Sequence, residues 1–442
     1  MKRRRIILLI VLLSYFVTAM DSSIVITGLV KIKDELNLSQ SALSWIQNAY
    51  VLSFGGFILL GGRLSDVFGR KRILNLSLLF FGLGSALAGA AESDVVMILA
   101  RLIQGVGASI LAPTSLALIM DTFAGKERTK AVAWYSSISG LGSSIGLVLG
   151  GFLASFLSWR IGFYINIPLT LLMLVLSLKI LSYDQMERRT FDFLGTVLSV
   201  PGIFSFVYAI NGAENPVIWL ILSFVLLVVF LWVEKRSQTP LMPLVLFKSK
   251  IRSAAYLART FYMCAMLGFW FYISEYLQGV LSFTPILTGV AFFPMTISLF
   301  LAAVMVPRMV DRMGNKCVLF IGILFLFIGF IWTLQLDENS GYLTNAIFPM
   351  ILLGFGQGFS MSPMTNLGIY AAAQENAGAA SGLVNVAHQI GGSIGLSIMV
   401  AISGGTTMLV IEFHRAMIVG LVFIVLMAFV SRIFPQKLDA GR

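Results

Sequence analysis

Charged residues are scarce in this chain. Of its 442 residues only 12% are Lys, Arg, Asp or Glu, whereas 58% are hydrophobic. A soluble globular protein carries about 25% charged residues, because water must solvate its surface. The mean hydropathy of +0.92 agrees with this shortage. The composition excludes an ordinary soluble domain and favours a protein whose surface faces lipid.

Groups that carry chemistry are also few. The chain has two cysteines, Cys264 and Cys317, which provide no disulfide framework. The two histidines, His388 and His414, do not belong to a cluster of metal-ligating residues in the sequence. No Gly-Lys pair is followed by Ser or Thr, so the phosphate-binding loop of ATPases is missing from the sequence. We therefore expect no metal, no cofactor and no enzymatic activity.

Long apolar runs are abundant instead. A membrane-spanning helix needs about 20 mostly apolar residues. Fourteen segments meet this requirement, and no connection between them is long enough for a soluble domain. The predicted spans are 6–30, 44–62, 73–91, 96–120, 131–157, 161–181, 192–211, 217–233, 254–279, 286–306, 317–336, 345–369, 379–403 and 415–434.

The N-terminus allows two interpretations. A basic run, 2–5, precedes apolar residues, as in a secretory signal peptide. However, the apolar run continues past Asp21 to Val30, which is longer than the core of a signal peptide. We expect an uncleaved first helix.

The basic residues predict the orientation. The net charge of +11 is concentrated in short runs on alternate connections, among them 70–72 and 248–250. Such runs mark cytoplasmic loops and do not indicate nucleic-acid binding. We expect a multi-pass protein of the cell membrane with both termini in the cytoplasm.

An internal repeat predicts the architecture. Arg63, Asp66, Gly69 and Lys71 recur at identical spacing 245 residues later as Arg308, Asp311, Gly314 and Lys316. Parallel six-helix halves are a transporter architecture. We expect an all-α polytopic fold with a six-helix bundle at 1–181, two inserted helices at 182–235 and a second six-helix bundle at 236–442.

Three charged residues lie inside predicted spans, where a charge is costly and suggests function. Asp21 and Arg101 are expected at similar depth, and Glu275 near the outer end of its helix. Burial raises the pKa of a carboxylate and a nearby guanidinium lowers it, so a carboxylate subject to both effects can bind and release a proton. Alternatively, Asp21 and Arg101 form a structural pair and Glu275 reaches interfacial water. Arg259 is expected to extend its side chain to the membrane surface.

Several motifs resemble a known family. The loop 62–71 resembles the signature of the major facilitator superfamily, and 21–25, 101–105 and 159–168 resemble motifs of its fourteen-helix drug:proton antiporter branch. Tyr50 is similar to a residue of that branch's second helix. The resemblance implies a conformational latch in the loops, the alternative being plain topology determinants that contact anionic lipid. The implied latch residues are Gly62, Asp66, Gly69, Arg70, Lys71, Asp311 and, as a partner for Asp66, Arg128.

Glycines of the fifth span resemble the antiporter motif of the same branch. Gly142, Gly146 and Gly150 stand four residues apart, followed by Gly151, and they form a smooth face that permits close helix packing. Such packing between the halves is what a rocking interface needs.

The expected substrate cavity combines polar and aromatic side chains, which attract organic cations, although such rings also simply face lipid or neighbouring helices. Its residues are Tyr50, Gln104, Trp270, Tyr272, Gln278, Gln357, Asn385 and Gln389. We expect a monomeric, proton-coupled exporter of small lipophilic, often cationic, drugs, powered by the proton gradient. The alternatives are a carrier of a defined metabolite or lipid and, in another class, a non-transporting sensor or intramembrane enzyme.

Overall fold

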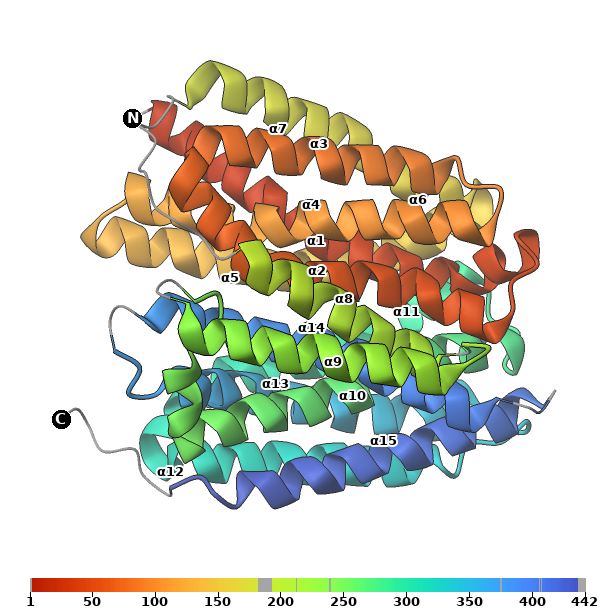
Figure 1. The fold of residues 1–442 in the computed structure, drawn as a ribbon. Helices are drawn as coiled ribbons and strands as arrows, with labels where there is room; N and C mark the ends of the chain where they lie inside the picture. Colours follow the sequence, from red (N-terminus) through yellow and green to blue (C-terminus); the bar gives the residue numbers. More distant parts are fainter. Residues whose placement is uncertain are drawn as a thin grey trace. The chain divides into compact units, whose positions relative to one another are not determined.

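The protein is helical throughout the part that the structure describes. This computed structural model describes residues 2–181, 193–211, 213–237, 240–373, 376–404, 406 and 408–435. Within these ranges the regular structure contains helices and no strands (Figure 1). Each of the fourteen predicted spans lies largely within helical residues, which confirms the all-α polytopic fold.

The first nine helices follow the predicted spans closely. The sixth span is broken at Ile165 into two helices, and this break lies within the motif 159–168. The bounds are α1 Lys2–Glu35, α2 Gln40–Phe68, α3 Arg70–Gly89, α4 Asp94–Thr122, α5 Gly125–Phe156, α6 Trp159–Tyr164, α7 Asn166–Ile180, α8 Phe193–Ile210 and α9 Pro216–Arg236.

The remaining helices include one that joins two spans. Helix α12 contains most of 286–306 and all but the end of 317–336, with non-helical backbone at Gly314 between them. The bounds are η1 Leu244–Lys248, α10 Lys250–Gly279, α11 Pro285–Ala291, α12 Phe293–Thr333, η2 Tyr342–Ala346, α13 Ile347–Ile369, α14 Ala377–Ser403 and α15 Leu409–Ser431.

The chain divides into two compact units. The first contains Met1–Phe204, Leu222–Leu241 and Thr284–Gly289; the second contains Ser205–Ile221, Met242–Phe283 and Val290–Arg442. Each unit therefore contains most of one six-helix half, and α8 and α9 contribute residues to both. The predicted boundary after residue 181 adjoins 182–192, which lie outside the described residues.

The helices have the length and composition of membrane spans. Nine helices of the described part are long and apolar enough to cross a bilayer, and shorter apolar helices run over Leu141–Phe156 and Leu194–Ile210. Large apolar side chains are correspondingly exposed, for example Phe224 at 70% and Phe429 at 67%. In water such a surface would be unstable, so it faces lipid.

The internal repeat has the same local structure in both halves. Gly69 and Gly314 adopt positive φ angles of 90° and 83°, which glycine tolerates best. The lysine two residues later binds the last helix of its own half each time. Lys71 Nζ donates to Leu178 O at 2.9 Å, and Lys316 Nζ donates to Arg432 O at 3.1 Å. The repeated motif thus anchors the third helix of each half to the sixth.

Candidate functional site

The charged residues of the first unit meet in one buried cluster. Asp21 on α1 and Arg101 on α4 are fully buried, and Arg101 Nη1 lies 2.7 Å from Asp21 Oδ2. The other carboxylate oxygen accepts two hydrogen bonds, from Gln104 Nε2 at 2.7 Å and from Asn166 Nδ2 at 2.8 Å. Three side chains from two further helices therefore bind the two carboxylate oxygens.

The surroundings of Arg101 complete the cluster. Its Nε donates to Ile46 O at 3.2 Å, and its Nη1 also donates to Gln104 Oε1 at 2.5 Å. The guanidinium carbon lies 4.2 Å from the centre of the Tyr50 ring, a cation–π distance. Tyr50 and Gln104, which were expected to line the cavity, are here buried partners of the charged pair.

Small residues bring the helices close enough for these bonds. A Cβ on Gly84 of α3 would lie 2.6 Å from the backbone nitrogen of Gln104. A Cβ on Gly105 would lie 2.5 Å from Tyr50 O, so α2 and α4 also touch through their backbones. The cluster is held by close backbone packing on both sides of α4.

Two members of the cluster were missed by sequence reasoning. Asn166 and Ser85 bind the same groups: the Ser85 hydroxyl accepts from Gln104 Nε2 at 2.8 Å and from Asn166 Nδ2 at 3.2 Å. Asn166 lies within the motif 159–168, and an asparagine in an apolar span was a usable signal. Ser85 offered none, because serines are common in membrane helices.

The cluster also contains buried polar atoms without partners. Among the described residues, Arg101 Nη2 and Asn166 Oδ1 have no hydrogen-bond partner. A buried polar group without a partner costs free energy.

The predicted site residues of α10 lie in the second unit. Glu275 and Tyr272 are buried, and Tyr272 Oη is 2.5 Å from Ser403 Oγ. Trp270 is half-buried, with its ring centre 6.0 Å from that of Phe292, and Gln278 Nε2 donates to Ser274 Oγ at 3.1 Å. These residues contact other parts of the second unit, and their role in binding stays a prediction.

A second polar cluster lies toward the other end of α10. Tyr262 donates to Gln357 Oε1 on α13 at 3.3 Å. Arg259 is buried and donates to Met361 O at 3.2 Å, so the expectation that its side chain extends to the membrane surface is wrong. On α14, Asn385 is exposed and donates to Ser381 O, whereas Gln389 is half-buried.

The antiporter glycines contact the helix that carries Asp21. A Cβ on Gly142, Gly146 or Gly150 would lie within 2.8 Å of the backbone or side chains of α1, including Met20 O at 2.5 Å. Their neighbour is thus α1, in the same half. Gly151 faces the backbone of Pro285 at the start of α11.

The loop motif forms an ion-pair network. Arg70 pairs with Asp66 and, through Nε at 3.1 Å, with Asp121 at the end of α4. Arg128, the suggested partner of Asp66, instead donates to Phe123 O at 2.9 Å and Met120 O at 3.2 Å. Arg128 therefore caps α4, because the last carbonyls of a helix carry partial negative charge.

Other motif residues have simpler surroundings. Lys71 is buried, so contact with lipid does not explain it. Gly62 has ordinary space around it, since a Cβ would lie 3.7 Å from Pro113. The tight position is Gly61, whose Cβ would lie 2.6 Å from Ser109 O. Asp311 is exposed.

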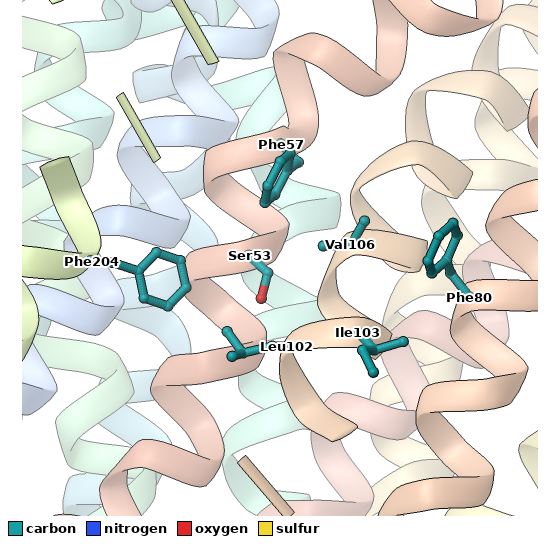
Figure 2. Close-up of a pocket in the computed structure, with 7 residues that line it drawn as sticks. All are labelled: Ser53, Phe57, Phe80, Leu102, Ile103, Val106 and Phe204. Carbon is teal, nitrogen blue, oxygen red and sulfur yellow. The ribbon is translucent and has the colours of Figure 1, made fainter. Parts of the chain in front are cut away.

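The first unit also has a pocket of about 310 Å³ beside α4. Figure 2 shows Phe204 of α8 and Phe80 of α3 on opposite sides of it. Except for Ser53 the lining is apolar, and it contains none of the residues predicted to form the cavity; the lining residues are Ser53, Phe57, Phe80, Leu102, Ile103, Val106 and Phe204.

Comparison with known proteins identifies the family. The family model of the Major Facilitator Superfamily matches residues 11–396, which is most of the chain. The chain belongs to the Major Facilitator Superfamily. It is similar to a puromycin resistance protein of Streptomyces alboniger, with 35% identity over 412 residues covering 90% of this chain and 82% of that protein. It is also similar to the multidrug transporter protein MdtP of Bacillus subtilis, with 27% identity covering 90% and 75%.

Solved structures agree on the fold. The POT family transporter PepTSo superposes with a TM-score of 0.72 at 16% identity, over 98% of each chain. The xylose transporter XylE from E. coli gives 0.68 at 15% identity, over 98% of this chain and 97% of that one. The protein is therefore a multi-pass membrane transporter of the major facilitator type and not an enzyme.

Proposed function

We propose that this transporter exports small lipophilic drugs from the cell in exchange for protons. It acts as a monomer in the cell membrane, with both termini in the cytoplasm and the proton gradient as its energy source. The observation that carries the proposal is the buried pair of Asp21 and Arg101. A proton bound by Asp21 would remove one of the two charges of this pair.

Protonation of Asp21 would alter every bond in the cluster. The neutral acid loses its ionic attraction to Arg101, and a proton on Oδ1 would face the Gln104 and Asn166 amide groups, which donate to that oxygen. Removing one charge of a buried pair leaves the other uncompensated, at a cost of about 3–5 kcal/mol. That cost favours a rearrangement of α1 against α4, and alternating access requires such a two-state element.

The loop network supplies a second element of this kind. We infer that Arg70, held between Asp66 and Asp121, keeps the ends of α2, α3 and α4 together in one state. Glu275 is a further candidate for proton or cation binding, because it is a buried acid in a membrane helix.

The names of the relatives support drugs as the cargo. Relatives include a puromycin resistance protein, a cephamycin export protein of Amycolatopsis lactamdurans that is 28% identical over 89% of this chain, and a multidrug transporter protein. Aromatic rings of α10 pack against neighbouring rings, for example Phe269 edge-on against Phe330 and Tyr276 at a tilt against Phe413. The proposal therefore does not depend on a cationic cargo.

Substrate-linked proton release tests the proposal. Proton and drug compete in this scheme, so adding puromycin to the purified full chain in weak buffer should release protons. Asp21→Asn should release none from this site, and it should lose puromycin efflux in an efflux-deficient host. By the same linkage, drug binding to the unmodified protein should weaken as the pH falls.

The controls separate coupling from folding. Expression and thermal stability of Asp21→Asn should be compared with those of Asp34→Asn, a change at an exposed acid on the same helix. If Asp21→Asn released as many protons as the parent and still drove efflux, the assignment of Asp21 would be wrong.

A further inference from the structure

The polar cluster of the second unit has the composition of a binding site. Gln357 on α13 is 4% exposed and accepts a hydrogen bond from Tyr262 on α10. The ring of His388 on α14 lies 6.4 Å from the Tyr262 ring in a stacked orientation. Three helices thus each contribute one polar side chain to the same place, where Tyr262 and Gln357 are buried and His388 is half-buried.

Two groups in this cluster are unused. Gln357 Nε2 and His388 Nδ1 are buried and have no hydrogen-bond partner among the described residues. Tyr262 binds the amide oxygen of Gln357, and the amide nitrogen can only donate. A buried amide donor without an acceptor is unfavourable, and a ligand that brings an acceptor atom would remove that cost.

The electrostatic field around the cluster is positive. The Arg259 guanidinium carbon is 5.9 Å from the Tyr262 ring centre, and its charge acts on His388. The sequences of α13 and α14 contain no acid, and the single acid of α10 is Glu275. Glu275 follows Arg259 by 16 residues, about 24 Å along the helix axis. Its carboxylate is too distant to neutralise the cluster.

The two halves differ at matching places. Each fourth helix carries a Gln-Gly pair, Gln104 in α4 and Gln357 in α13, and each glutamine binds a residue of the first helix of its half. In the first half that residue is the acid Asp21, which already has its cationic partner. In the second half it is the neutral Tyr262, beside a buried guanidinium. The second half therefore favours a ligand that accepts hydrogen bonds.

We propose that Tyr262, Gln357 and His388, in the field of Arg259, bind the hydrogen-bond-accepting or anionic end of the exported compound. The carbonyl or carboxylate oxygen of the compound would accept from Gln357 Nε2. This proposal rests on the proposed transport function and adds the chemistry of the cargo.

Two dyes with the same three-ring xanthene frame test the proposal, anionic fluorescein and cationic rhodamine 123. Their binding to the purified full chain would be measured by fluorescence anisotropy. The unmodified protein should bind fluorescein more tightly. Gln357→Leu should weaken fluorescein binding about tenfold, the usual effect of losing a hydrogen bond to a charged group, and should leave rhodamine 123 little changed. Gln357→Glu should reverse the preference, because it replaces the donor with a negative charge.

Controls address folding and the underlying function. Gln335→Leu makes the same change at an exposed glutamine in the turn that follows α12 and should alter neither affinity. Tighter binding of rhodamine 123, binding of neither dye, or equal loss of both in Gln357→Leu would overturn the proposal. Proton release is measured separately: fluorescein binding without substrate-linked proton release would contradict proton coupling and leave this site standing.

Discussion

At the scale of single residues, the carboxylate of Asp21 is bound by side chains that are distant from it in the sequence. Its carboxylate is bound by Arg101, Gln104 and Asn166, which come from α4 and α7. Because the positive and negative charges balance, the cluster tolerates burial only while all of its members are present. Asn166 is informative here, since it is neutral and faces the oxygen that Arg101 does not bind.

Replacing Asn166 with aspartate should therefore change the response to pH. A second carboxylate beside Asp21 disfavours its charged form, because like charges repel strongly in a buried site. In Asn166→Asp the pH at which puromycin binding is half-maximal should rise by about one unit or more. Isothermal titration calorimetry with puromycin at several pH values measures this half-maximal pH.

A control substitution makes the same change elsewhere. Asn339 is exposed in the connection after α12. The pH profile of Asn339→Asp should match that of the parent. An unchanged profile in Asn166→Asp as well would mean that the Asp21 cluster does not control drug binding.

At the scale of helices, glycine contacts decide which helices meet. The glycine face of α5 was expected to serve an interface between halves, but Gly142, Gly146 and Gly150 contact α1. Close approach of α5 fixes the backbone of α1 at Met20, next to Asp21. The motif thus positions the proton-binding candidate.

A methyl group on Gly146 should disturb this contact. Its Cβ would lie 2.5 Å from Met20 O and 2.9 Å from the Cβ of Ser23, so α1 must shift. Overpacking of this kind costs about 1–3 kcal/mol. Gly146→Ala should lower the apparent unfolding temperature in detergent and also reduce proton release on adding puromycin.

The matched control is another helical glycine with open space. Nothing lies within 4 Å of a Cβ on Gly378, near the start of α14. Gly378→Ala should leave the unfolding temperature unchanged or raise it slightly, since alanine favours helix. Equal stability of both variants would show that α1 and α5 are not packed as described.

At the scale of the whole molecule, the repeat and the charge pattern define the topology. The repeated loops place Lys71 and Lys316 against the last helix of their own halves. The predicted orientation places these loops in the cytoplasm, because cytoplasmic connections are enriched in Lys and Arg.

Labelling of single cysteines tests that orientation. In a chain with Cys264 and Cys317 replaced by alanine, Glu127→Cys and Glu338→Cys introduce thiols at exposed positions on connections expected on opposite sides. A membrane-impermeant maleimide added to intact cells should label the variant at 338 and spare the variant at 127. Inside-out vesicles should give the reverse, and labelling of both from one side would contradict the topology.

The sequence by itself determined the fold class, the fourteen spans and the family, because apolar runs, loop charges and short motifs are local properties. It also identified Asp21 and Arg101, since a charge within an apolar run is visible without coordinates. Only the tertiary structure decided the partners of these groups: Arg101 and Asn166 reach Asp21 across 80 and 145 residues of sequence. The same holds for the burial of Arg259 and for the contact of α5 with α1. Such pairings depend on which helix faces approach one another, and that follows from the packing of the folded unit.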